Sequence, residues 1–97
     1  MDKRTHRIVN KLGMHMRAAN VFCEMANRFA CEVMVSRGDV RVNGKSIMGL
    51  MMLAAGCGTS IVVETSGDDE EQAAVALEGL IAGGFGEELA EAPEDAS

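Results

Sequence analysis

The period of the hydrophobic pattern is the feature of this sequence that most restricts its fold. Short runs of alternating or β-branched apolar residues are followed by runs whose apolar residues recur every three or four positions, and glycines lie in the connections. Strands joined by helices and by one hairpin favour a two-layer α+β domain, with an antiparallel sheet covered by helices on one face. The predicted order is β-α-β-β-α-β-α, with strands at 5–9, 32–36, 39–43 and 60–65 and helices beginning at Met16, Ile47 and Asp68.

The first predicted helix begins directly after a histidine. At this position His15 meets free backbone N–H groups and the positive end of the helix dipole, which favour an anion. Imidazole is a nucleophile near neutral pH, and the guanidinium of Arg17 offers a fork of donors to phosphate oxygens. These are the parts that a phosphohistidine needs, although a histidine that only caps the helix is the alternative interpretation. The apolar stripe that defines the helix comprises Ala18, Phe22, Met25, Ala26 and Phe29.

The second predicted helix, over 47–55, begins after Ser46, which is a good N-cap. This helix is apolar nearly all round, and one face suffices to cover a sheet, so apolar side chains are expected to remain on the surface. Methionine side chains adapt to several partners, which indicates a docking surface. Complete burial of the helix is the alternative. We expect Leu50, Leu53 and Ala54 to point inward, and Ile47, Met48 and Met51 to point partly outward. The predicted docking residues are Met16, Ile47, Met48 and Met51.

Charge is distributed unevenly along the chain. The net charge of −6 argues against a nucleic-acid partner. Residues 1–45 nevertheless carry a charge of +5, whereas residues 46–97 carry −11 and contain neither lysine nor arginine. The basic half suits an anionic ligand or an acidic protein surface. The acidic, alanine-containing segment 87–97 is typical of a disordered tail, so the folded domain is predicted to span residues 1–86.

Cysteine usage and hydropathy exclude several other classes of protein. Three cysteines without a CxxC pair fit neither a disulfide framework nor a zinc site, so we expect reduced thiols packed as small hydrophobic groups. His6 and His15 do not have metal-ligand spacing, and neither a metal nor a cofactor is expected. Apolar runs are shorter than the roughly 20 residues needed to cross a bilayer, and the N-terminus leads into no apolar signal segment. We therefore expect a cytoplasmic protein that does not insert into membranes.

Two segments resemble a known family. The first is Gly13-Met14-His15-Met16-Arg17-Ala18-Ala19, which is similar to the phosphorylation site of the histidine-containing phosphocarrier HPr and its nitrogen-branch relatives. That pattern is a glycine, an aliphatic residue, the active histidine, a small residue, then arginine, proline and alanine. The second segment, residues 42–50, resembles the family's regulatory-serine block. The resemblance extends from about residue 4 to 86 and implies the HPr-like open-faced β-sandwich.

Two positions depart from the pattern of the family. Ala18 stands in place of the proline, and Met16 in place of a small residue. Alanine is an excellent helix former, so the helix is retained, with one additional N–H group at the site. Met16 enlarges the apolar rim around His15. Neither change removes a chemical group that phosphoryl transfer requires, but both bear on which partners are recognised.

The resemblance implies a phosphoryl carrier rather than an enzyme. His15 would accept a phosphoryl group on Nδ1 from the phosphoenolpyruvate-dependent enzyme I and pass it to IIA domains in sugar uptake, with Arg17 as the phosphate clamp. Ser46 would be a regulatory site for a dedicated HPr serine kinase/phosphorylase. A monomer is expected, because one site must be presented to several partners. The alternatives are a nitrogen-type regulatory phosphocarrier, a regulator that acts by contact alone, and a small hydrolase, for which no general base is evident.

Overall fold

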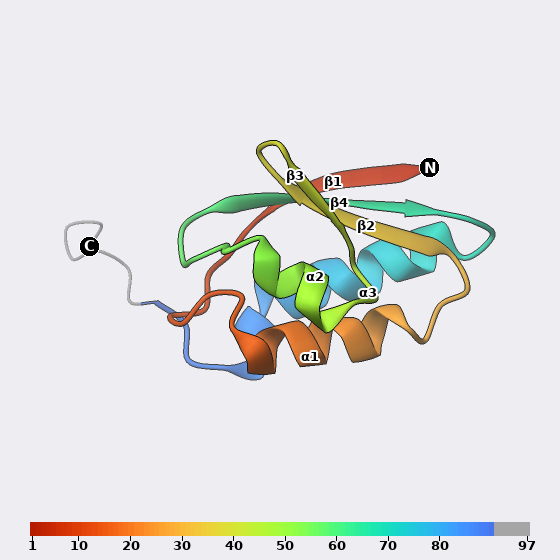
Figure 1. Ribbon diagram of the computed structural model, residues 1–97. Helices are drawn as coiled ribbons and strands as arrows, with labels where there is room; N and C mark the ends of the chain where they lie inside the picture. The colour runs from red at the N-terminus through yellow and green to blue at the C-terminus, as the bar shows by residue number, and fades with distance from the viewer. Residues whose placement is uncertain (91–97) are drawn as a thin grey trace.

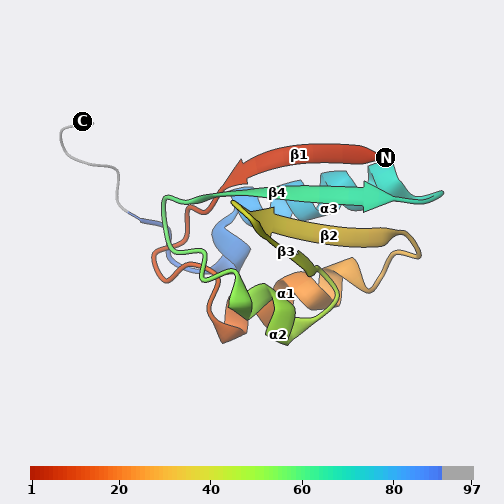
Figure 2. The ribbon, with the colours of Figure 1, turned by 45° about the horizontal axis from the view of Figure 1, so that its top comes forward.

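A four-stranded antiparallel sheet carries three helices on one face (Figures 1 and 2). The computed structural model describes residues 1–90. Its strands follow the spatial order β1-β4-β2-β3, and all three pairs are antiparallel. This arrangement confirms the predicted α+β open-faced sandwich. The elements are β1 (Asp2–Arg7), α1 (Met16–Ala26), β2 (Glu32–Arg37), β3 (Val40–Asn43), α2 (Ile47–Met52), β4 (Ser60–Ser66), α3 (Glu70–Ala82) and the short 3-10 helix η1 (Gly84–Gly86).

The hydrophobic core lies between the two central strands and the helices. Strand residues with a period of two point alternately to the helices and to solvent. Val33 and Val35 on β2, and Ile61 and Val63 on β4, therefore form the buried floor of the sandwich. The helices cover this floor with side chains that are fully buried or nearly so: Phe22 from α1, Leu50 from α2, and Leu77 and Ile81 from α3.

The second helix ends earlier than the sequence predicts. Helix α2 stops at Met52, Leu53 is its C-cap, and Ala54 takes a left-handed backbone conformation with φ of 50°. The helical period no longer applies after this point, so Ala54 is exposed while Leu53 and Ala55 are buried. The expectation that Ala54 points inward was therefore wrong, whereas Leu50 and Leu53 lie in the core as predicted.

The three cysteines are free thiols, but they do not share one environment. Cys23 and Cys31 are buried, and Cys57 is exposed. Cys57 lies between Gly56 and Gly58 in the connection from α2 to β4, where the chain turns on the surface. The prediction of small buried groups is correct for the first two and wrong for Cys57.

The first residues of the predicted acidic tail make backbone contacts with the domain. Residues 87–90 were assigned to the acidic tail, but in the structure they lie against the loop that precedes α1. Leu89 forms an isolated antiparallel bridge with Asn10, and the Ala90 N–H donates to the Val9 carbonyl oxygen at 2.9 Å. Backbone hydrogen bonds thus attach this acidic segment to the domain. The remaining part of the predicted tail, 91–97, lies outside the described residues.

Candidate functional site

The loop before α1 follows a tight path that fixes the position of His15. Gly13 has a φ of 73°, a conformation that L side chains rarely adopt. A Cβ atom at this residue would lie 2.8 Å from the carbonyl oxygen of Ala55, so the loop packs directly on the chain that follows α2. The Met14 N–H donates to that same oxygen at 2.8 Å, and the His15 N–H donates to the Gly13 carbonyl at 2.9 Å.

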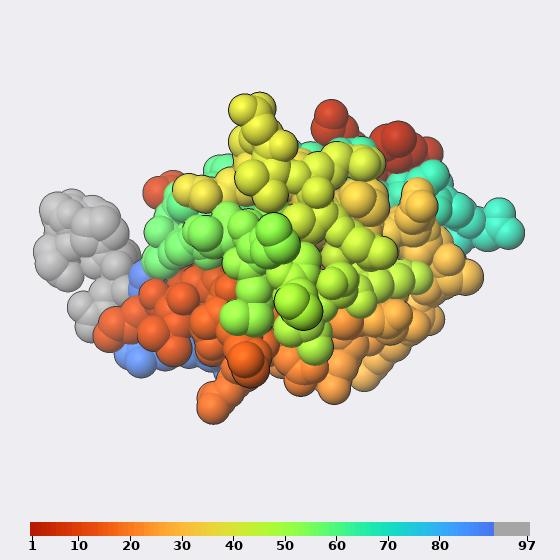
Figure 3. Space-filling model, viewed as in Figure 1, coloured from red at the N-terminus to blue at the C-terminus, as the bar shows by residue number. Residues whose placement is uncertain are grey.

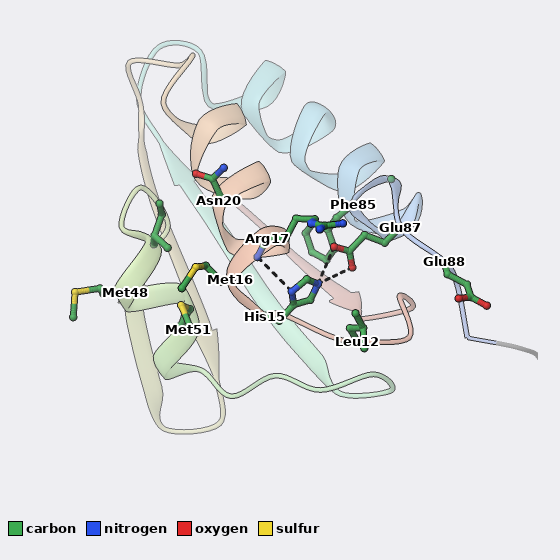
Figure 4. A pocket seen from close by; sticks show the side chains of 12 residues that line it. Leu12, His15, Met16, Arg17, Asn20, Met48, Met51, Phe85, Glu87 and Glu88 are labelled. Carbon is green, nitrogen blue, oxygen red and sulfur yellow. Dashed lines mark hydrogen bonds and ion pairs between the residues drawn. The ribbon is translucent and has the colours of Figure 1, made fainter.

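The imidazole of His15 has different partners on its two nitrogens (Figure 4). His15 is the N-cap of α1, and its Nδ1 accepts a long hydrogen bond of 3.3 Å from the backbone N–H of Arg17. Its Nε2 lies 2.9 Å and 2.8 Å from the two carboxylate oxygens of Glu87. An ionised carboxylate can only accept, so Nε2 carries the proton and Nδ1 presents its lone pair at the start of the helix.

Glu87 is held in the ionised form that this assignment requires. The hydrogen bond from His15 lowers the pKa of the Glu87 carboxyl below its usual value, and a hydrogen bond from Asn10 and the charge of Arg17 act in the same direction. Partial burial opposes this shift but does not outweigh it. Asn10, which is fully buried, donates through Nδ2 both to Glu87 at 3.0 Å and to the Gly13 carbonyl at 2.8 Å. The same amide therefore ties Glu87 to the loop that carries His15.

Arg17 lies in the first turn of α1 with its side chain exposed. Figure 4 shows the Arg17 side chain near the Glu87 carboxylate, and its positive charge contributes to lowering the pKa of that carboxyl. An exposed guanidinium on a flexible stem can turn toward an incoming anion, and it offers a planar fork of donors. The structure therefore brings together the two residues that the sequence assigned to phosphoryl chemistry.

The predicted docking residues line one open groove together with His15. The groove has a volume of ≈ 1010 Å³, and Met16, Ile47, Met48 and Met51 form much of its wall. Met16 is 64% exposed, Met48 77% and Met51 40%, so this apolar surface is open to a partner. Figure 3 shows α2 and the start of α1 side by side on the same face of the molecule. The expectation of outward-facing methionines on α2 is thereby confirmed.

Ser46 caps the helix that carries those methionines. Its Oγ accepts a hydrogen bond of 3.1 Å from the backbone N–H of Gly49, and the residue is partly exposed. Ser46 is adjacent in sequence to Ile47, which lines the groove. A change of charge at this serine would therefore act beside the methionine surface.

Two further features concern residues 1–90, the part of the chain that the structure describes. No cluster of three or more histidine, cysteine or acidic side chains in this part of the chain could hold a metal ion. In the same range, no helix has the length and apolar character needed to cross a membrane.

Comparison with known proteins identifies the family. A family model described as the PTS HPr component phosphorylation site matches residues 3–83. The chain belongs to the HPr family of phosphocarrier proteins. Phosphocarrier protein HPr from Neisseria meningitidis serogroup A is 58% identical over 87 residues, which cover 90% of this chain and 98% of that relative. The predicted family is thus confirmed over nearly the whole described chain.

Solved HPr structures have the same fold. A crystal structure of HPr-C-His from Thermoanaerobacter tengcongensis matches with a TM-score of 0.88 at 43% identity, covering 92% of this chain and 100% of that one. An HPr dimer from the same organism matches with a TM-score of 0.72 at 41% identity, covering 90% and 100% of the two chains. That relative was crystallised as a dimer, so the monomeric state expected for the present chain stays a prediction.

Sequence reasoning missed Glu87, Asn10 and Phe85, which lie around His15 but outside the motif. Glu87 belongs to a segment whose composition is typical of a tail, and the acidic residues around it conceal its role. The available signal was the run Gly83-Gly84-Phe85-Gly86, which predicts a sharp turn after α3 and contains a single large apolar residue. Phe85 is buried, so this turn leads the chain back over the domain.

Proposed function

We propose that this member of the HPr family accepts a phosphoryl group on Nδ1 of His15 from phosphorylated enzyme I and passes it to IIA domains in sugar uptake. The observation that supports this proposal is the hydrogen bonding of the two nitrogens of the His15 imidazole. Its Nε2 is engaged by a carboxylate, and its Nδ1 carries a lone pair at the N-terminus of α1. The family of the chain provides the class of donor and acceptor.

In the proposed step, the lone pair of Nδ1 forms a bond to phosphorus. The bond between phosphorus and the donor group of enzyme I breaks, and its electron pair stays with the donor. The ring retains its proton on Nε2 and becomes positively charged. Phosphoryl transfer requires mainly in-line positioning and charge stabilisation. The free N–H groups of the first turn of α1 and the guanidinium of Arg17 supply donors for the phosphoryl oxygens.

Intact-mass measurement tests this function directly. The purified protein is incubated with phosphoenolpyruvate and enzyme I, and we expect one phosphoryl addition that is labile in acid and maps to His15. A subsequent mixture with sugar-permease IIA and nitrogen-type IIA acceptors shows which of them removes the group. Transfer to the nitrogen-type acceptor alone would contradict a role in sugar uptake and favour the nitrogen-type regulatory function. Absence of any addition with either type of enzyme I would exclude the phosphocarrier function and favour regulation by contact.

We further propose that enzyme I and the IIA acceptors dock on the groove lined by Met16, Ile47, Met48 and Met51. The Met48→Glu variant should weaken binding of enzyme I about tenfold or more, because a charge would be buried in an apolar contact. Titration calorimetry measures the effect. Met52 is a matched control, since it lies on the same helix and is 71% exposed but does not line the groove. Equal losses for Met48→Glu and Met52→Glu would contradict docking at the groove.

Ser46 is proposed as a regulatory phosphorylation site for an HPr serine kinase/phosphorylase. The Ser46→Asp variant should slow phosphorylation of His15 by about tenfold, because like charges meet when the protein docks on an acidic partner. Ser46→Asn is the matched neutral control, since asparagine and aspartate are comparably good N-caps. The rates are measured by quenched intact-mass kinetics. Equal rates for the two variants would argue against electrostatic regulation at this residue.

The cellular setting follows from the same proposal. Enzyme I and the IIA acceptors act with phosphoenolpyruvate inside the cell, so the protein is proposed to work in the cytoplasm. Free thiols at Cys23, Cys31 and Cys57 agree with a reducing compartment. A direct measurement of molecular mass in solution, such as sedimentation equilibrium, would decide between a monomer and the dimer crystallised for a relative.

A further inference from the structure

We propose that Glu87 is a positioning residue for phosphoryl transfer: its carboxylate holds the His15 ring in the tautomer that presents Nδ1 as the nucleophile. This inference rests on the proposed function of His15, and it adds a residue that lies beyond the phosphorylation motif. Two observations support this role: the contacts of the Glu87 carboxylate, and the backbone conformation of the segment that contains Glu87.

The carboxylate of Glu87 is placed to accept a single, specific proton. Both of its oxygens lie within 2.9 Å of Nε2 of His15. The Glu87 side chain is 13% exposed, compared with 31% for His15, so the pair is partly shielded from water. A neutral imidazole in water exchanges its proton between both nitrogens, whereas a fixed carboxylate beside one nitrogen selects the form that is protonated there. Selection of the Nε2–H form leaves the lone pair on Nδ1.

The backbone on the N-terminal side of Glu87 is folded into a conformation that costs free energy. Gly84, Phe85 and Gly86 all have positive φ values, of 67°, 58° and 77°. A left-handed conformation is inexpensive for glycine, but it strains the backbone of a residue with a side chain. The strained Phe85 is buried beside the groove that contains His15. The surrounding structure therefore stabilises a turn that reverses the chain and directs it toward the imidazole.

The backbone on the C-terminal side of Glu87 is attached to the loop that precedes His15. The Lys11 N–H donates to the Glu88 carbonyl oxygen at 2.9 Å, and the Ala90 N–H donates to the Val9 carbonyl at 2.9 Å. The side chain of Glu87 itself is held by Asn10, as described above. Glu87 is thus fixed on both sides and through its side chain, which is the arrangement expected of a group that orients a catalytic or ligating histidine.

The same carboxylate suits the charge that develops during transfer. When Nδ1 forms its bond to phosphorus, the ring becomes positive, and the hydrogen bond from Nε2–H to Glu87 then becomes one between two charged groups. When the phosphoryl group leaves for the acceptor, the electron pair of the N–P bond returns to Nδ1 and the ring is neutral again. The proton stays on Nε2 throughout, so no proton has to be delivered or removed in either direction.

Two measurements on the Glu87→Gln variant test this role. Glutamine has nearly the same shape as glutamate, but its amide can donate as well as accept, so it no longer selects one tautomer. Nitrogen-15 NMR of the unphosphorylated protein should show His15 mainly as the Nε2–H form in the natural protein and as a mixture of both forms in the variant. Phosphorylation by enzyme I should be about tenfold slower, a loss typical of removing a group that orients a functional histidine.

Glu78→Gln is the matched control, since it removes the same unit of charge from an ion pair with Arg4, away from His15. This control should leave both readouts unchanged. An unaltered tautomer in Glu87→Gln, or an altered tautomer with an unaltered rate, would overturn the positioning role. If the natural protein accepts no phosphoryl group, the proposed function fails, yet the tautomer measurement still decides whether Glu87 orients the ring. Amide spectra of both variants verify that they are folded.

Discussion

The His15→Asn variant should fold with nearly unchanged stability and accept no detectable phosphoryl group from enzyme I. Asparagine lacks a nucleophilic ring nitrogen, so the bond to phosphorus cannot form. It is nevertheless among the best N-cap residues, so the start of α1 should keep its hydrogen bond. The loss of the contact with Glu87 is expected to change the free energy of unfolding by about 1 kcal/mol or less, because the pair is only partly shielded from water and the His15 side chain is 31% exposed.

Asparagine is more informative here than alanine because it separates the two interpretations of His15. If the histidine were only a cap, His15→Asn would retain every activity of the protein. Intact-mass analysis after incubation with phosphoenolpyruvate and enzyme I provides the comparison, and urea unfolding provides the stability. His6 remains in the variant, so residual phosphorylation would identify His6 or another side chain as an acceptor and would contradict the assignment to His15.

The sequence predicts the parts of this fold that depend on local pattern. The period of two placed β2 and β4 within a residue of their observed bounds, and the helical stripe with Phe22 placed α1. The ends of helices were less predictable, since Phe29 continues the apolar stripe although α1 stops at Ala26. Packing of a helix end against its neighbours depends on residues distant in sequence, which a local period does not register.

The candidate site also contains residues that local sequence predicts and a residue that it does not. His15 and Arg17 are two residues apart at one helix start, so their cooperation could be predicted from the sequence. Glu87 is 72 positions from His15, and the two meet only because α3 and η1 return the chain to the loop before α1. An acidic residue among other acidic residues carries no local sign of such a contact. Only the tertiary structure distinguishes Glu87 from its neighbour Glu88, which is exposed and lies 3.9 Å from the ammonium of Lys11.

Gly13→Ala should destabilise the protein by about 3 kcal/mol, the combined cost of a left-handed alanine and of a close contact with backbone atoms. The added Cβ would lie 2.8 Å from both the Ala55 carbonyl oxygen and the Cα of Gly56. Neither atom can move as a flexible side chain would, so the loop itself must shift. For a domain of this size, the melting temperature should fall by roughly 12–24 °C.

Gly38→Ala separates the two contributions to this loss. Gly38 has a similar φ of 59°, but a Cβ there would meet nothing within 4 Å, so its substitution incurs the conformational cost alone. We expect a loss of about 1 kcal/mol and a fall of roughly 4–8 °C in melting temperature. The difference between the variants then measures the packing of the His15 loop on the segment after α2. Equal losses would show that this contact is soft, and that the position of His15 is determined instead by its hydrogen bonds to Arg17 and Glu87.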